Sequence, residues 1–270
     1  MSEEELNAIA RLDPLKSVIA GAMRRIQHKV DRAVTSNNPS QLFWVKQLNS
    51  IEGEYGMIMA AWRRSAPAMI RDGFTEGAIS TRRVLRAFTS VRETKTQPDT
   101  LAAMIDDTIL RMAQATEGGQ AMVQTLFRRT RQRVLTEIEI NERLAIGLID
   151  GTPQSIKTEL EDAIRARIAN GQLLEVVGEN RTTYWRPDKY AELVARTRVR
   201  EAQTAGAIAQ VREAGLDLVQ VSSHQTDTEL CQQFEGNVYS ISGESQTYPQ
   251  LEESPPFHPN CQHVLVPFVE

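Results

Sequence analysis

The sequence predicts an α+β protein: a mainly helical N-terminal region followed by a small α+β C-terminal domain closed by a terminal strand. Apolar residues recur at three- and four-residue steps through the first 145 residues, which is the period of an amphipathic helix. From residue 216 the pattern changes to short runs rich in β-branched residues, as is typical of strands. The turn-forming segment IDGTPQS at 149–155 is the clearest boundary within the chain, so we expect two regions, 1–150 and 151–270.

The N-terminal region is expected to contain five helices, at about 15–33, 41–66, 75–93, 99–116 and 119–146. The apolar face of the first is formed by Val18, Ile19, Met23, Ile26 and Val30. The segment SNNPSQ at 36–41 favours a turn, because Ser, Asn and Pro stabilise non-helical backbone. Pro67 and the Gly118–Gly119 pair are expected to interrupt later helices, and Asp99 to cap the helix after Pro98.

The second region is expected to begin with a helix capped by Thr152, with Pro153 at its first position. Its apolar stripe is Ile156, Leu160, Ile164 and Ile168, and Asn170-Gly171 predicts its end. We expect a hairpin over 173–185 with GEN at its turn, and then a helix from Asp188 to about Ala214, ended by Gly215. Strands are predicted in LDLVQVSS, NVYSISG and the terminal HVLVPFVE.

Composition limits the class of protein. The chain has 270 residues, of which 41% are hydrophobic and 24% charged, as in ordinary globular proteins. It contains no apolar run long enough to cross a membrane, so we expect no membrane partner. The N-terminal segment MSEEELNAIARL is acidic where a signal peptide would be basic, which favours synthesis and folding inside the cell.

Charge differs between the two regions. Residues 1–150 carry 21 Lys and Arg against 18 Asp and Glu, whereas residues 151–270 carry 10 against 17. A small positive excess does not indicate a dedicated nucleic-acid domain. Arginine pairs nevertheless recur in the N-terminal region and can be read either as contacts to nucleic acid or as solvated helix faces paired with Glu: Arg24-Arg25, Arg63-Arg64, Arg82-Arg83 and Arg128-Arg129, with Arg131 and Arg133 close by.

Both cysteines and three of the four histidines fall in the last fifty residues. His258 and Cys261 are three positions apart across a Pro-Asn turn, and Cys261 and His263 are two apart, so on a strand they share a face. Cys231 can supply a fourth ligand, giving the Cys2His2 set of a structural zinc site, with His224 as a spare. Two alternatives stay open: metal-free packing of the same side chains, and a Cys231–Cys261 disulfide.

The tail motif resembles the C-terminal region of phage minor capsid (head morphogenesis) proteins, the Mu-F-like and minor-capsid-protein-2 group. In that group a Cys and a Gly-x-Val/x-Tyr segment precede a Pro-Pro-x-His-Pro-Asn-Cys turn and a final strand. The resemblance covers about 185–270 and includes the helix 190–206. The matching positions are Cys231, Gly236, Val238, Tyr239, Tyr248, Pro249, Pro255, Pro256, His258, Pro259, Asn260 and Cys261.

The chain departs from the group's pattern at two places. Many relatives have Cys-x-x-Cys where this chain reads CQQF, with Cys231 alone. After the HPNC segment they carry Arg followed by Cys or His, whereas Gln262 and His263 follow here. The first departure weakens a metal-binding role inferred from the group, and the second leaves that role open.

The resemblance implies a structural virion protein made in the host cytoplasm and carried in the head interior near the portal. Its implied partners are the portal protein and the major capsid protein, with packaged DNA a further candidate through the N-terminal arginine pairs. Its implied role is in head assembly and in genome packaging or delivery. The region 1–150 is then expected to make the portal or capsid contacts.

Two other function classes compete with this prediction. A nucleic-acid-binding protein would use the arginine pairs, and a Cys/His nucleophile or metal-dependent nuclease would use the tail. No glycine-framed turn surrounds either cysteine, and no base is offered to them at a spacing that a short loop could use. We therefore predict no catalytic residues and no enzyme activity.

Overall fold

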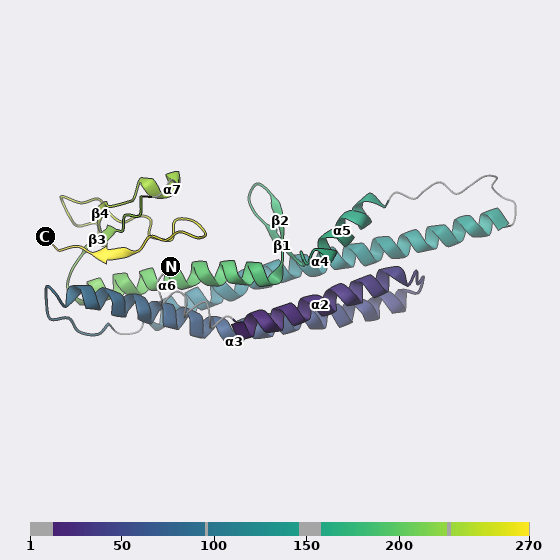
Figure 1. Cartoon of the computed structure of the whole chain (residues 1–270), viewed down its shortest axis with the longest axis horizontal. Helices are drawn as coiled ribbons and strands as arrows, with labels where there is room; N and C mark the ends of the chain where they lie inside the picture. The colour runs from purple at the N-terminus through teal and green to yellow at the C-terminus, as the bar shows by residue number, and fades with distance from the viewer. Residues whose placement is uncertain (1–12, 95–96, 146–157, 226–227, 270) are drawn as a thin grey trace. The chain divides into compact units, whose positions relative to one another are not determined.

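Long helices make up most of the chain, and short antiparallel strands accompany them, which confirms the α+β class. The computed structural model describes residues 13–94, 97–145, 158–225 and 228–269 (Figure 1). The helices are α2 (Asp13–Thr35), α3 (Gln41–Leu85), α4 (Pro98–Ala145), α5 (Glu159–Ala169), α6 (Pro187–Glu213) and α7 (Glu229–Gln232). The strands are β1 (Leu174–Val177), β2 (Thr182–Trp185), β3 (Leu218–Val221), β4 (Val238–Ser240) and β5 (Leu265–Pro267). None of the helices described has an apolar stretch that could span a bilayer.

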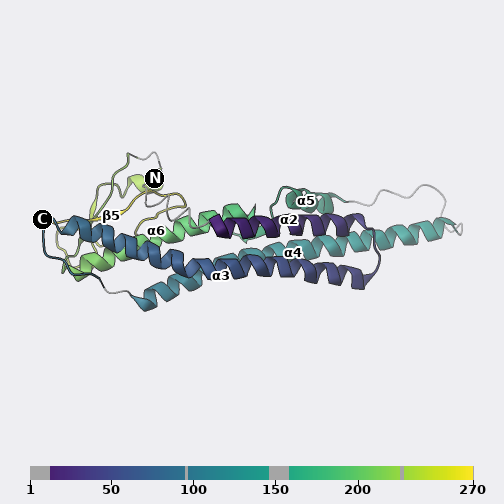
Figure 2. The ribbon, with the colours of Figure 1, turned by 60° about the horizontal axis from the view of Figure 1, so that its bottom comes forward.

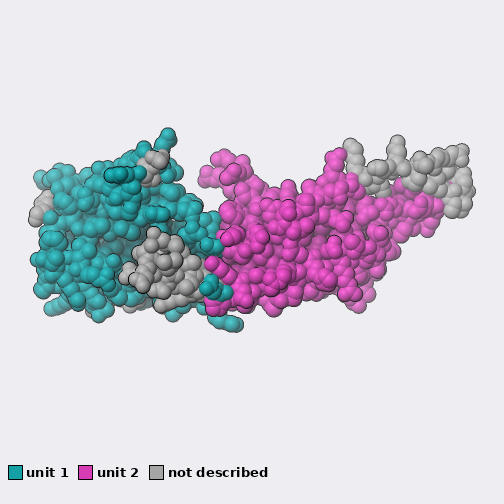
Figure 3. Space-filling model, viewed as in Figure 1, with its two compact units in different colours: residues 1–13, 63–109, 192–270 teal, residues 14–62, 110–191 magenta. Residues whose placement is uncertain are grey.

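The chain forms two compact units, each assembled from separate segments (Figure 3). Unit 1 comprises residues 1–13, 63–109 and 192–270, and unit 2 comprises residues 14–62 and 110–191. The chain passes from one unit to the other within three helices: between residues 62 and 63 in α3, 109 and 110 in α4, and 191 and 192 in α6. Each unit thus draws on both predicted regions, and the functional division between 1–150 and 151–270 stays a prediction.

In unit 2, α2 runs alongside the first part of α3 and the later part of α4 (Figures 1 and 2). The predicted apolar face of α2 is buried except for Val18, which is exposed. Trp44 of α3 packs on Phe127 of α4 with ring centroids 5.1 Å apart. The largest fully buried side chains of this unit are Ile19, Ile26, Ile51, Tyr55, Ile58, Trp62, Met112, Leu126, Leu173 and Leu174.

Two predicted helix breaks in the first 145 residues are wrong. Pro67 lies inside α3, which is one helix from Gln41 to Leu85 and ends earlier than the predicted 75–93 segment. Buried residues precede and follow Pro67, among them Trp62, Ala66 and Ile70, and their packing offsets the lost backbone hydrogen bond. Likewise Gly118 and Gly119 lie inside the single helix α4.

The glycines of α4 are contact points for a neighbouring strand. A Cβ at Gly119 would lie 2.0 Å from the carbonyl oxygen of Leu173, and one at Gly118 would lie 2.8 Å from that of Glu175. Leu173 and Glu175 belong to the start of the hairpin, which the sequence predicted correctly. The Gly-Gly pair therefore permits close backbone approach rather than ending a helix.

Unit 1 contains an equally close crossing between its parts of α3 and α6. Cβ atoms at Gly77 and Gly73 would lie 1.9 Å from the Gln203 carbonyl oxygen and 2.8 Å from that of Val199. On the other helix, a Cβ at Gly206 would lie 2.0 Å from the Phe74 carbonyl oxygen. Beside this crossing lies an apolar cluster of Ile70, Phe74, Leu101, Ala202 and Ala209.

The three-stranded sheet of unit 1 has the order β4-β3-β5, with both neighbours antiparallel to β3. Val219 pairs with Tyr239 on one side and with Pro267 on the other. One face of the sheet packs on the end of α6 through Val211, Val219, Val221, Ile241 and Leu265. All three predicted tail strands are confirmed, including the last one.

Between residues 151 and 215, some predicted helix ends are confirmed and some predicted helix starts are not. Gly171 has φ 75° and Gly215 has φ 71°, the left-handed conformations expected at the ends of α5 and α6. In α5, Ile164 and Ile168 are buried but Leu160 is exposed. The predicted Thr152-Pro153 start and Ile156 lie outside the described residues. Pro187 and Pro98, not the caps Asp188 and Asp99, begin α6 and α4, so each Asp lies in the first turn.

Candidate metal centre

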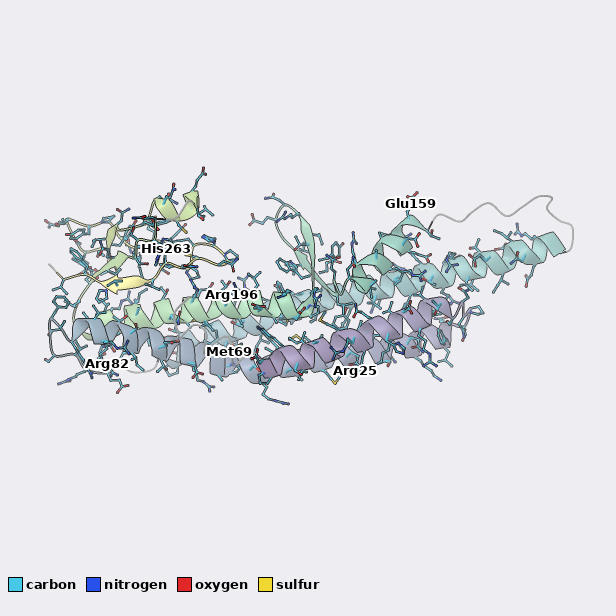
Figure 4. All side chains as sticks on the ribbon, viewed as in Figure 1. Arg25, Met69, Arg82, Glu159, Arg196 and His263 are labelled. Atoms are coloured by element: carbon cyan, nitrogen blue, oxygen red, sulfur yellow. The ribbon has the colours of Figure 1, made fainter. Side chains whose placement is uncertain are left out.

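Cysteine and histidine side chains from three parts of the tail meet beside the sheet of unit 1. Cys231 lies on α7, and His258 and Cys261 lie in the long connection between β4 and β5. His263, labelled in Figure 4, lies just before β5. Cys231, Cys261 and His263 are buried, and His258 is half-buried. Burial alternates from Cys261 to Leu265, so Cys261 and His263 share a face as predicted.

Three of the four predicted ligands are brought together. The ligand atoms of Cys231, His258 and Cys261 all lie within 4.8 Å of one another. Among the described residues, these three form the group of Cys, His, Asp or Glu side chains that could hold a metal ion. The two sulfur atoms are 3.9 Å apart and both cysteines are free. This separation exceeds a disulfide bond of about 2.05 Å.

His263, the fourth predicted ligand, makes different contacts. Its Nδ1 lies 3.4 Å from the Cys261 sulfur, and its Nε2 lies 2.7 Å from Glu235 Oε1. Glu235 also accepts a 2.9 Å hydrogen bond from the backbone N–H of His224. His224 is exposed, and its ring meets that of His263 edge-on with centroids 5.0 Å apart. The spare histidine is thus a packing neighbour of His263.

The Pro-Asn turn is fixed by its backbone and by α6. Asn260 has φ 75°, a left-handed conformation that asparagine tolerates better than most residues. Its side-chain oxygen accepts a 2.9 Å hydrogen bond from Arg196 Nη1 (both Arg196 and His263 are labelled in Figure 4). The Nδ1 of His258 lies 2.8 Å from the Pro259 carbonyl oxygen. A neutral His258 that donates from Nδ1 leaves Nε2 unprotonated, the form that binds metal ions.

Aromatic rings wall the cluster on one side. Phe257 stacks on Phe234 with centroids 4.2 Å apart and an interplanar angle of 7°. Phe257 also contacts the ring of His263, with centroids 6.1 Å apart. Because both phenylalanines pack against the sheet core, they couple the cluster to the fold of the tail.

The electrostatic environment disfavours a reactive thiolate at Cys231. Burial, together with the neighbouring Cys261 and Glu235, raises the pKa of the Cys231 thiol to about 11. A thiol with that pKa is neutral near pH 7 and a weak nucleophile. In the absence of a cation, Cys231 is therefore a small buried hydrophobe.

Cys261 lies beside the predicted His263, but the sequence did not predict the carboxylate of Glu235 behind the imidazole ring. The contacts Cys261–His263–Glu235 place a ring nitrogen beside a sulfur and a carboxylate behind the ring, so the prediction that no base is offered to either cysteine is wrong. The same sequence of thiol, imidazole and carboxylate occurs in enzymes that use a cysteine nucleophile. Here, however, Cys261 is 1% exposed and His263 4%, so a substrate could not reach the sulfur without rearrangement of the tail.

Two further residues of the site escaped the sequence analysis. Glu235 lies four residues after Cys231, next to Gly236, and only the fold brings it to His263. Arg196 lies in the helix that the resemblance included, but no local pattern links it to Asn260, 64 residues away. Neither residue type nor spacing marks such long-range partners.

Residues 68–270 match the family model described as "Phage minor capsid protein 2". The protein is therefore of the virion-structural class: a capsid protein of a bacteriophage. It belongs to the phage minor capsid protein 2 family. The match extends well beyond the predicted 185–270 and includes the end of α3 and all of α4. No curated protein and no solved structure matches the chain.

Proposed function

We propose that this protein lies in the head interior near the portal, where it attaches to the portal and the major capsid protein and acts in head assembly and genome packaging or delivery. The observation that carries the proposal is the family match, which covers 68–270. Membership in a capsid family implies contacts with other virion proteins. The identity and position of those partners are our inference.

Apolar side chains on the helices support an attachment role. In unit 2 several large ones are exposed: Val18, Leu42, Val45, Met57, Leu110 and Ile138. Leu42 is 63% exposed and lies three residues from Val45 on α3, so the two share a helix face. Exposed apolar side chains that recur on helices are candidates for a protein interface.

The arginine pairs divide into two groups. Arg25, Arg82 and Arg133 form ion pairs within the chain, with Glu54, Glu93 and Glu137 respectively. The other six members of the pairs are exposed and can reach an external anion: Arg24, Arg63, Arg64, Arg83, Arg128 and Arg129. If packaged DNA is a partner, these six are the residues that we expect to contact its phosphates.

The attachment proposal is tested best on the full chain, because a cut at 150 would divide both units. We expect the double variant Leu42→Ser, Val45→Ser to lose co-purification with the portal protein while keeping its melting temperature. Val177→Ser, 75% exposed on the hairpin, is the matched control and should retain the portal. Loss of portal binding in the control alone would move the attachment to region 151–270, and failure of the wild-type chain to retain portal would refute the proposal.

We further propose that the tail cluster acts through stability and has no turnover. Supporting this are the burial of Cys261 and the raised pKa of Cys231. His258→Ala should then lower the melting temperature and reduce the yield of filled heads in proportion. If instead folding and incorporation into virions were normal while infectivity was lost, the site would have an active role.

A further inference from the structure

The sulfur–sulfur separation in the tail is compatible with a shared metal ion and is too long for a disulfide. Two thiolates on one tetrahedral zinc, with bonds of about 2.3 Å, lie about 3.8 Å apart. The distance between the sulfurs of Cys231 and Cys261 is 3.9 Å. A ring nitrogen of His258 lies within 4.8 Å of both, so a single centre can be reached by all three side chains with little movement.

The chemistry of the donors selects the metal. Two thiolates and one imidazole form a soft, nitrogen- and sulfur-rich set, which binds zinc and disfavours magnesium or calcium, since those ions require oxygen ligands. When bound, zinc would supply only a cross-link between α7 and the β4–β5 connection. Because His258 is only half-buried, solvent can reach this side of the cluster.

We propose that Cys231, His258 and Cys261 bind one zinc ion, and that His263 is a positioning residue that holds Cys261 rather than a ligand. His263 is 4% exposed, and it is held between Glu235 at 2.7 Å and Cys261 at 3.4 Å. Glu235, the exposed His224 and Phe257 are the groups that face its ring from the surrounding segments. A histidine fixed in this way orients a metal-bound sulfur through a hydrogen bond, as neighbours of ligands commonly do.

The zinc content of purified full-length protein tests the ligand set. Wild type and His28→Ala, a histidine control in unit 2, should carry one zinc per chain. Cys231→Ser, His258→Ala and Cys261→Ser should carry none. His263→Ala should still bind one zinc, with a dissociation constant raised ~10–100-fold. Complete loss of zinc in His263→Ala, equal to that in Cys261→Ser, would overturn the three-ligand assignment.

A measurement on the wild-type chain alone guards against variants that do not fold. Cobalt(II) titrated into zinc-stripped protein should give the visible absorption of a tetrahedral site and a sulfur-to-cobalt band as strong as two thiolates produce. A chelator should lower the melting temperature of wild type, and added zinc should restore it. No tetrahedral spectrum and no zinc binding would overturn the proposal, as would a mass two hydrogens lighter under non-reducing conditions, which shows a disulfide instead.

Discussion

The hydroxyl of Tyr55 donates a 2.7 Å hydrogen bond to the backbone carbonyl of Leu173, 118 residues further along the chain. Tyr55 is fully buried, and burial raises the pKa of its hydroxyl well above the usual range, so it stays protonated and able to donate. This bond ties α3 to the residue that precedes β1 inside unit 2.

Tyr55→Phe removes the donor and leaves a buried carbonyl without it. We expect the free energy of unfolding to fall by about 1–3 kcal/mol, the cost of such a group. Urea titration followed by circular dichroism measures it. Tyr239→Phe, the same change at a half-buried site, should cost less than half as much, and equal losses would contradict the role of the hydrogen bond.

Gly119→Ala should destabilise unit 2 by ~3 kcal/mol or more, because overpacking against backbone is not relieved by a rotamer change. The added Cβ would lie 2.0 Å from the Leu173 carbonyl oxygen. Gly53→Ala is the control in the interior of α3, where nothing lies within 4 Å of the new atom. That control should gain about 0.5–1 kcal/mol from better helix propensity. A neutral Gly119→Ala would show that the strand is not held so closely to α4.

Glu54 is a buried carboxylate held by two cations. Burial alone would raise its pKa, but hydrogen bonds and charge from Lys29 and Arg25, 2.6 and 2.7 Å away, lower the pKa below its ordinary 4.5. A depressed pKa in the folded state means that this stabilisation is present above pH 4.5 and is lost as pH falls below it.

Glu54→Gln should therefore lower the free energy of unfolding by about 1 kcal/mol at pH 7. The loss is small because the side chain of Arg25 is about half exposed. The difference between wild type and variant should shrink as pH falls below 4.5. Thermal melts at pH 7 and pH 3 measure it, with Glu52→Gln on the same helix as control. A difference in melting temperature that grows on acidification would contradict the lowered pKa of Glu54.

Asn260 combines a left-handed backbone with the hydrogen bond from Arg196. Asn260→Ala should lose about 1–2 kcal/mol, since alanine avoids that conformation and cannot accept the bond. Asn260→Gly keeps the backbone and loses only the bond, so it should be the more stable variant in thermal melts. An order with alanine above glycine would show that the backbone conformation does not matter.

In metal-free protein, ionisation of the Cys231 thiol should lower the free energy of unfolding at alkaline pH. Its folded pKa is raised from 9.0 to about 11, so stability is fully present below pH 9 and is lost as pH rises towards 11. Urea titrations in chelator at pH 8 and pH 10.5 should show a larger decline for wild type than for Cys231→Ala. Equal declines would mean that other groups control the alkaline limit.

The sequence predicted elements whose signal is local. Gly171 and Gly215 end helices because a left-handed residue is a property of one position, and the tail strands follow from β-branched runs. Pro67 and Gly119 were misread for the opposite reason. Their effect depends on what packs against them, which a pattern of spacing does not contain.

The candidate site shows the same limit. Residue type and spacing predicted that Cys231, His258 and Cys261 could converge, and the fold brings them together. The partner of His263 could not be predicted, because Glu235 is one of many acidic residues and becomes special only through a distance of 2.7 Å.

The close crossing of α3 and α6 has a consequence for how the chain is made. Phe74 leaves the ribosome more than a hundred residues before Gly206, the residue on which its backbone rests. Until then the apolar side chains of Ile70 and Phe74 have no partner from α6, and closing so long a loop is slow. A nascent chain of this kind is prone to aggregate. Its yield in the host should accordingly depend on what covers that stretch of α3 before synthesis is finished.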